Sequence, residues 1–167
     1  YEIPGMEFAG RVASVGTRVS SVAPGDEVMG IVGGGSYASQ LVTHERLLLP
    51  VPGGVPLADA AAIPEVFITA FDALVLQGGL TAGRWALVHG GASGVGTAAI
   101  QLVRAVGASS IVTTSTAKVE RCARLGADVV VDYTTEDFVA VSKGTTAGRG
   151  VDVVLDMVGG SYLPRNV

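Results

Sequence analysis

The part of the sequence that most constrains the fold begins at Arg84, where short apolar runs alternate with helix-like segments. Compact apolar runs bounded by turn residues predict buried strands, and the amphipathic spacing between them predicts helices. Strands that alternate with helices form a parallel sheet with right-handed connections, so we expect a doubly wound α/β fold. The expected strands are 85–89, 110–114, 127–132 and 151–157, and the expected helices are 97–106, 117–125 and 136–142.

The glycine-rich stretch "HGGASGVG", residues 89–96, lies between the first expected strand and the first expected helix. A tight turn there needs residues without a Cβ, and the helix that follows directs free N–H groups and its positive dipole at a pyrophosphate. Ser93 replaces the middle glycine of the G-x-G-x-x-G fingerprint, and its hydroxyl is able to donate a compensating hydrogen bond. The residues at the three glycine positions of the fingerprint, and the expected pyrophosphate-binding residues, are Gly91, Ser93 and Gly96.

The end of the second expected strand predicts which dinucleotide binds. NAD-binding folds place an Asp or Glu about 20 residues after the glycines, against the ribose hydroxyls. This chain has "TTSTAK" instead, with neutral hydroxyls at Thr114, Ser115 and Thr116 and a positive charge at Lys118. These groups attract a 2′-phosphate rather than repel it, so the expected cofactor is NADPH. The plain alternative is that Lys118 is a solvated lysine in the first turn of a helix.

Residues 1–66 have a different pattern, in which short strands are separated by turn signals such as Pro24-Gly25-Asp26 and Gly33-Gly34-Gly35. This pattern is typical of a β-barrel, and we expect strands in "DEVMGIV" from Asp26 and in the alternating "SYASQLVTH" from Ser36. The next segment, 65–77, has helical spacing. Its apolar face is expected to contain Phe67, Ala70, Phe71, Leu74 and Val75. The sequence therefore predicts two domains, 1–66 and 67–167.

Composition limits the kinds of partner. The net charge is −4, and the eleven Lys and Arg residues are scattered, so nucleic acid is not an expected partner. No apolar run approaches the ~20 residues that cross a bilayer, so we expect no membrane span. The single cysteine, Cys122, allows no disulfide framework within the chain, which favours a cytoplasmic location.

Several stretches along the chain resemble the zinc-independent quinone oxidoreductases of the medium-chain dehydrogenase/reductase superfamily, in the ζ-crystallin-like, p53-inducible-protein-like branch. They are "GMEFAGRVASVG", "GDEVMG", "AAIPEVFITAFDAL", "VHGGASGVGTAAIQL", "LGADVVVDY" and "GVDVVLDMVGGSYLPRNV". The resemblance implies a truncated GroES-like β-barrel domain followed by a truncated Rossmann domain. It also implies a homodimer when the protein is full length.

The resemblance also implies roles for particular residues. Thr69 corresponds to the family threonine near the nicotinamide, and Ala92 to Gly96 correspond to the pyrophosphate loop. Lys118 and Tyr133 correspond to the pair that grips the 2′-phosphate of NADPH. The family's substrate-pocket tyrosine and asparagine are not matched here, so the catalytic residues are unknown.

A zinc site is not expected. Met6 stands where the zinc alcohol dehydrogenases of this superfamily have a histidine, and zinc needs three or four Cys, His or carboxylate ligands. His44 and His89 are expected to serve packing or surface hydrogen bonding, and Cys122 to be a buried structural thiol. Glu7 is expected to make a structural hydrogen bond.

The function implied by the resemblance is NADPH-dependent reduction of quinones or related conjugated carbonyls by hydride transfer from the nicotinamide. Two alternatives stay open. "GMEFAGRV" and "GDEVMG" also resemble the reductase modules of polyketide synthases, which implies an enoyl reductase that acts on a conjugated thioester, although "GGSYLPRNV" is more typical of the free-standing quinone reductases. The other alternative is a protein that binds NADPH without turnover.

Overall fold

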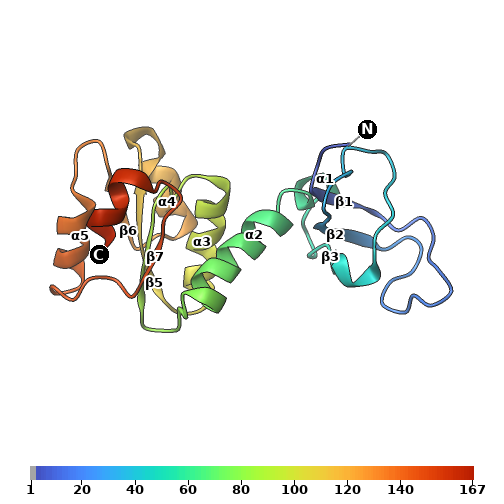
Figure 1. Ribbon diagram of the computed structural model, residues 1–167, viewed down its shortest axis with the longest axis horizontal. Helices are drawn as coiled ribbons and strands as arrows, with labels where there is room; N and C mark the ends of the chain where they lie inside the picture. The colour runs from blue at the N-terminus through green and yellow to red at the C-terminus, as the bar shows by residue number, and fades with distance from the viewer. Residues whose placement is uncertain (1–2) are drawn as a thin grey trace. The chain divides into compact units, whose positions relative to one another are not determined.

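The computed structural model describes residues 3–167. They form two compact units, one that ends at Val66 and one that begins at Phe67. Each unit has its own sheet, and Figure 1 shows the elements of both. Within residues 3–167, no helix combines the length and the apolar character that crossing a membrane requires.

The first unit contains a three-stranded antiparallel sheet in the order β1-β2-β3. Phe8 of β1 pairs with Gly30 of β2, and Phe8, Val28 and Met29 are buried. Gly30 has no room for a side chain, because a Cβ would meet the carbonyl of Leu47 and the ring of Phe8. The strand expected from Asp26 is therefore confirmed. The elements of this unit are β1 (Glu7–Arg11), β2 (Glu27–Ile31), η1 (Glu45–Leu47), β3 (Leu48–Pro50) and α1 (Leu57–Ala60).

The strand expected from Ser36 is wrong. Residues 36–44 have no strand, and Tyr37 and Val42 are 76% and 102% exposed. Gly34 and Gly35 turn the chain with positive φ angles, after which the amides of Ser36 and Tyr37 donate to the carbonyls of residues 5 and 4. Alternation predicts a strand only when one face is buried, and in residues 36–44 it is not.

The second unit contains a four-stranded parallel sheet in the order β6-β5-β4-β7, which confirms the α/β prediction. All four strands lie within two residues of the expected limits. They are β4 (Trp85–Val88), β5 (Ser109–Thr114), β6 (Val129–Asp132) and β7 (Val153–Leu155).

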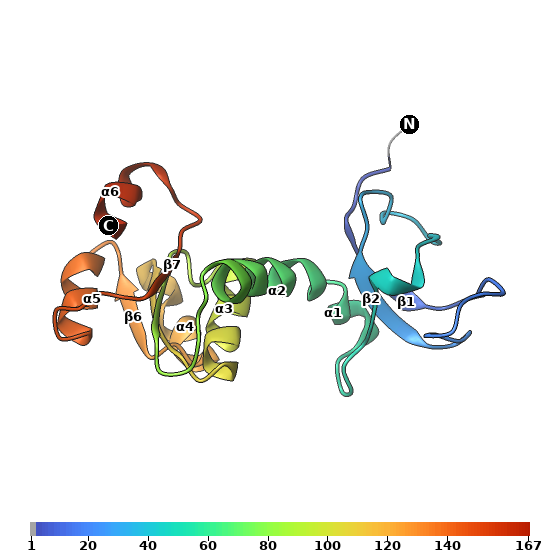
Figure 2. The same ribbon diagram turned by 60° about the horizontal axis from the view of Figure 1, so that its bottom comes forward.

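Helices cover both faces of this sheet. Helices α3 (Gly94–Ala105) and α4 (Val119–Leu125) pack on one face, and α5 (Phe138–Thr145) packs on the other (Figures 1 and 2). On the α5 side, the buried core consists of Leu87, Ile111, Val131 and Phe138. The shorter elements are η3 (Thr116–Lys118), η4 (Gly160–Tyr162) and α6 (Leu163–Asn166).

The expected helix at 65–77 is present but changes type along its length. It begins as α2 (Pro64–Phe71) and continues as η2 (Asp72–Gln77), a π-helical segment. Ala70 and Leu74 are fully buried, as predicted, whereas Phe71 is 42% exposed.

Candidate functional site

The order of the strands points to one edge of the parallel sheet. From β4, the chain continues to β5 and β6 on one side, and β7 lies on the other side. Ligands of open α/β sheets bind outside the carboxyl ends of the strands, at the point where the strand order reverses. The loop after β4 and the turn after β7 both lie at this point. The candidate site is therefore the carboxyl edge of β4 and its neighbours.

The loop after β4 is shaped by glycines. Gly90 has φ +70°, a left-handed conformation that favours glycine. A Cβ on Gly91 would lie 2.8 Å from Cβ of Val112 and 3.4 Å from the sulfur of Cys122. A Cβ on Gly96 would lie 2.8 Å from Cα of Gly91. Gly91 and Gly96 were predicted from the sequence, whereas Gly90 was not, although the Gly-Gly pair is a turn signal.

Strand β5 fixes this loop. The carbonyl of Thr113 accepts a hydrogen bond of 2.9 Å from the amide of Gly91, and its hydroxyl accepts one of 3.3 Å from the amide of Gly90. The amide of Ser93 donates to the carbonyl of Gly90 at 2.9 Å, which closes the turn. The backbone therefore has a defined shape without a ligand.

The start of α3 presents free donors. Ser93 is the N-cap, and its hydroxyl oxygen accepts a hydrogen bond of 3.0 Å from the amide of Gly96. The amides of Ala92, Gly94 and Val95 have no partner within residues 3–167. Free N–H groups and the positive end of a helix dipole together favour an anion. This edge is suited to a phosphate group.

The hydroxyl of Ser93 remains available as a donor. Its oxygen is used in capping, and its hydrogen is directed at the sulfur of Met157, 3.9 Å away in the turn after β7. A thioether is a weak acceptor, so a phosphate oxygen is able to replace it. This arrangement is compatible with the role expected for Ser93.

The other predicted residues follow the next two strands. Ser115 and Lys118 come after β5, and Tyr133 comes directly after β6. The amide of Tyr133 donates to the carbonyl of Thr114 at 3.1 Å, which joins the two strand ends. Lys118 is exposed, and Tyr133 is 50% exposed. These residues therefore share the carboxyl edge of the sheet with the glycine loop, whereas Thr69 lies apart in sequence on an exposed position of α2.

A polar cluster that sequence analysis missed lies between these strand ends. The hydroxyls of Thr116 and Thr134 are 3.1 Å apart, and that of Thr134 donates to Asp132 at 2.6 Å. The hydroxyl of Thr116 and then that of Thr134 lower the pKa of Asp132. Glu136 accepts from the amide of Asp132 at 2.9 Å. The segment that carries Tyr133 is thus held on both sides, and "DYTT" was the available signal, because an Asp often bonds its own backbone two residues on.

The potential metal ligands are committed to structural roles. Cys122 is fully buried beneath the glycine loop, and burial raises the pKa of its thiol. His44 accepts from the amide of Arg46 at 3.1 Å as the cap of η1. Glu7 accepts from the amide of Glu65 at 2.8 Å, which confirms the structural hydrogen bond expected of it. Residues 3–167 contain no group of three or more His, Cys, Asp or Glu side chains that fits a metal ion.

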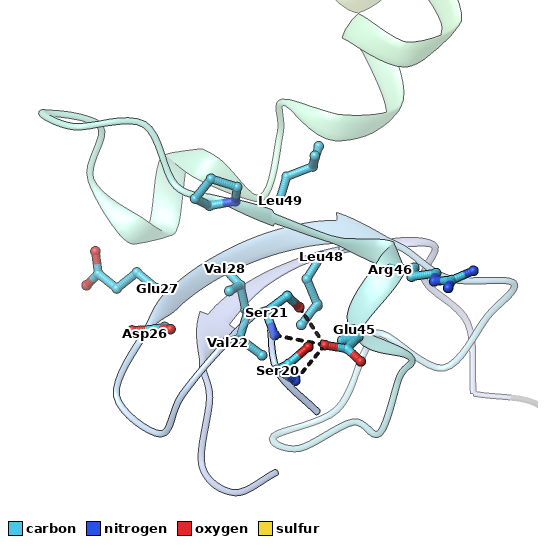
Figure 3. A pocket seen from close by; sticks show the side chains of 11 residues that line it. Ser20, Ser21, Val22, Asp26, Glu27, Val28, Glu45, Arg46, Leu48 and Leu49 are labelled. Atoms are coloured by element: carbon cyan, nitrogen blue, oxygen red, sulfur yellow. Dashed lines mark hydrogen bonds between the residues drawn. The ribbon is translucent and has the colours of Figure 1, made fainter. Parts of the chain in front are cut away.

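The first unit has a separate hollow, lined by β2, β3 and the segment around Ser20 (Figure 3). One carboxylate oxygen of Glu45 accepts from the amides of Ser20 and Ser21 at 3.0 and 2.9 Å and from the hydroxyl of Ser21 at 2.7 Å. These bonds, led by that from Ser20, lower the pKa of Glu45 to about 2. Glu45 therefore ties two loops together.

Comparison with known protein families agrees with this architecture. Residues 2–53 match the alcohol dehydrogenase GroES-like domain, and residues 94–167 match the zinc-binding dehydrogenase domain. The polyketide synthase type I Pks15/1 for phenolphthiocerol synthesis from Mycobacterium marinum (strain ATCC BAA-535 / M) is 42% identical over 98% of this chain and 8% of that protein.

Solved structures are also similar. The crystal structure of CurK enoyl reductase matches with a TM-score of 0.89 and 34% identity, over 98% of this chain and 50% of that chain. The quinone oxidoreductase of Pseudomonas syringae pv. Tomato DC3000 matches with a TM-score of 0.86 and 32% identity, over 99% of this chain and 51% of that chain. This chain thus spans about half of the solved chains and a small part of the polyketide synthase.

The chain belongs to the medium-chain dehydrogenase/reductase superfamily, whose members are oxidoreductases that bind nicotinamide cofactors. The GroES-like and Rossmann-like folds expected from its sequence are confirmed. The family model that matches the second unit is named for zinc, but the side chains of residues 3–167 provide no zinc-binding set.

Proposed function

We propose that this protein reduces quinones or related conjugated carbonyls with NADPH. The observation that carries the proposal is that the amides of Ala92, Gly94 and Val95, at the start of a helix at the switch point of the sheet, have no partner among residues 3–167. A dinucleotide phosphate satisfies these donors without a change in the loop.

The proposed roles divide the carboxyl edge between the two halves of the cofactor. Residues Gly91 to Gly96 would bind the pyrophosphate through backbone donors and the hydroxyl of Ser93. Ser115, Lys118 and Tyr133 would bind the 2′-phosphate side, where the ammonium group of Lys118 supplies charge. Thr69 would lie near the nicotinamide, which supplies the hydride when it is bound.

A specific observation supports a second candidate. The chain is similar to a polyketide synthase and to an enoyl reductase as well as to a quinone oxidoreductase. Reduction of an enoyl thioester uses the same cofactor site, because both acceptors are conjugated carbonyls. The third candidate, NADPH binding without turnover, has the same glycine loop. A cytoplasmic homodimer remains part of the proposal.

Acceptor turnover separates the three candidates. NADPH oxidation by the complete protein that carries this sequence would be followed at 340 nm with a soluble quinone and with an enoyl thioester. Faster turnover of the quinone at equal enzyme concentration supports the first proposal, and faster turnover of the thioester supports the second. Tight NADPH binding with neither acceptor reduced would contradict both and leave the binding protein.

A further inference from the structure

A fully buried histidine lies behind the glycine loop. His89 directly follows β4 and is 0% exposed. Its ring packs edge-on against Phe138 at 4.7 Å and Tyr162 at 4.8 Å between ring centroids. These contacts fix the plane of the ring, so its two nitrogens point in defined directions.

On one side, His89 is bonded to Thr113, the residue of β5 that holds the glycine loop. Its Nδ1 lies 3.1 Å from the hydroxyl of Thr113. The same hydroxyl accepts from the amide of Gly90, and the carbonyl of Thr113 accepts from the amide of Gly91. His89 therefore reaches the loop through a single shared oxygen.

On the other side, His89 is linked through Asn166 to Asp156, which holds the turn after β7. Its Nε2 lies 2.9 Å from Oδ1 of Asn166, whose Nδ2 donates to Oδ2 of Asp156 at 3.0 Å. The other oxygen of Asp156 accepts from the amides of Val158 and Gly159, both at 2.8 Å. Burial raises the pKa of Asp156, but the amides of Gly159 and Val158, the nearby His89 and the bond from Asn166 together lower it.

These bonds have one consistent direction. An ionised Asp156 only accepts, so the amide nitrogen of Asn166 faces it and the amide oxygen faces His89. A neutral His89 then donates from Nε2 and accepts at Nδ1 from the hydroxyl of Thr113. That hydroxyl keeps its lone pairs for the amide of Gly90. If the side-chain amide of Asn166 were flipped, or if the proton of His89 moved to the other ring nitrogen, two donors or two acceptors would face each other at the next bond of the chain.

The chain of bonds joins the two sides of the candidate site. One end sets the backbone of Gly90 and Gly91, and the other sets the turn at Val158 and Gly159. Met157 in this turn is also the residue whose sulfur lies against the hydroxyl of Ser93. A dinucleotide bound at the switch point would lie against both segments.

We propose that His89, Asn166 and Asp156 are positioning residues that hold the glycine loop and the turn after β7 at the spacing the nicotinamide dinucleotide requires. This inference rests on the proposed function, because it assigns these residues to the same cofactor site. Their effect on the cofactor passes through Thr113 and the backbone of the two segments. None of the three is a catalytic residue.

Exchange of the Asp and the Asn tests this role. Asn166→Asp places two carboxylates face to face, and Asp156→Asn places two amide nitrogens face to face. The double variant restores an acceptor opposite a donor and keeps the same donation from His89. We expect each single variant to weaken NADPH binding about tenfold and the double variant to bind within about twofold of the wild type.

The matched control is Arg165→Ala in the same short helix. Arg165 bonds to Asp137 at 2.6 Å and lies 4.3 Å from the centroid of Phe138, so this change loosens the helix without removing a member of the chain of bonds. We expect it to lower the melting temperature and leave the Kd of NADPH unchanged. Binding would be measured by calorimetry on the complete protein, at a temperature where each variant is folded.

A second readout follows the direction of the bonds. Long-range ¹⁵N–¹H spectra report which ring nitrogen of His89 carries the proton, and the loss of its signals in His89→Gln assigns them. We expect Nε2–H in the wild type and in the double variant, and a changed tautomer or charge state in Asp156→Asn. If these residues had only a structural role, the single variants would lower the melting temperature, but the tautomer of His89 and the Kd of NADPH would not change in Asp156→Asn and recover in the double variant.

The outcomes separate this inference from the proposed function. Unchanged cofactor affinity in folded single variants, or a folded double variant that still binds about tenfold more weakly, overturns the positioning role alone. If the single variants do not fold, rescue of folding and binding by the double variant supports the role. Wild-type binding without acceptor reduction overturns only the proposed function, and a wild type that binds neither NADPH nor NADH overturns both.

Discussion

The glycine loop and the ends of β5 and β6 lie at the same edge of the sheet but are built differently. The loop consists of backbone groups held by buried contacts to Thr113, Val112 and Cys122. The neighbouring strand ends present exposed side chains, chiefly Lys118 and Tyr133, above a network of hydroxyls and Asp132. Under the proposed function, the loop would determine whether a dinucleotide binds, and the strand ends would determine which one.

The largest expected effect is on the loop. In Gly96→Ala the new methyl group meets the backbone of Gly90 and Gly91, which has no rotamer with which to move away. We expect the free energy of unfolding to fall by about 3 kcal/mol, with loss of NADPH and NADH binding alike. Denaturant unfolding measures the first effect and calorimetry the second.

The control for that change is Gly144→Ala. Gly144 lies in helix α5, and a Cβ there has no atom within 4 Å. Alanine is favoured over glycine in a helix, so we expect the free energy of unfolding to rise by up to about 1 kcal/mol. Equal stability changes at the two glycines would contradict the close packing inferred for the loop.

The next effect is on cofactor choice. In Lys118→Ala, loss of one charge-assisted contact is expected to weaken NADPH binding by ~1.5 to 3 kcal/mol and to leave NADH binding nearly unchanged. The expected loss is smaller at high salt, because Lys118 is exposed. An unchanged ratio of the two affinities would show that the 2′-phosphate is bound elsewhere.

A smaller effect is expected at the helix cap. Ser93→Ala removes the acceptor for the amide of Gly96, which is expected to lower the free energy of unfolding by about 1 kcal/mol. Ser93→Thr is the matched variant, since it keeps a hydroxyl acceptor at the N-cap. If Ser93→Thr and Ser93→Ala lowered the free energy of unfolding equally, the capping bond would not be the source of the stability.

The smallest effect is expected at Asp132 and depends on pH. Its pKa is lowered in the folded state, so its contribution to stability is present above the unfolded value, near 3.8, and is lost as the pH falls through the folded value. Asp132→Asn should therefore flatten the dependence of unfolding on pH below about pH 4. Unfolding curves between pH 6 and about pH 2 measure the difference.

Much of the second unit could be predicted because its signals are local. The apolar run Trp85–Val88 predicts a buried strand, and the glycine pair that follows it predicts a tight turn before a helix. Both predictions need only neighbouring residues. The segment from Ser36 had an equally local pattern, but the strand expected there is wrong. Its alternating apolar residues are not covered in the described structure, and burial is decided by distant parts of the chain.

The sequence by itself determined the alternation of strands and helices and the need for small residues at Gly91 and Gly96. Only the tertiary structure decided that Gly90 makes the left-handed turn, that Thr116 and Thr134 bond with Asp132, and that His89 joins Thr113 to Asn166. The physical reason is separation along the chain. Periodicity records which face of an element is apolar, whereas hydrogen bonds between His89 and Asn166, 77 residues apart, form only when the sheet brings their strands and helices together.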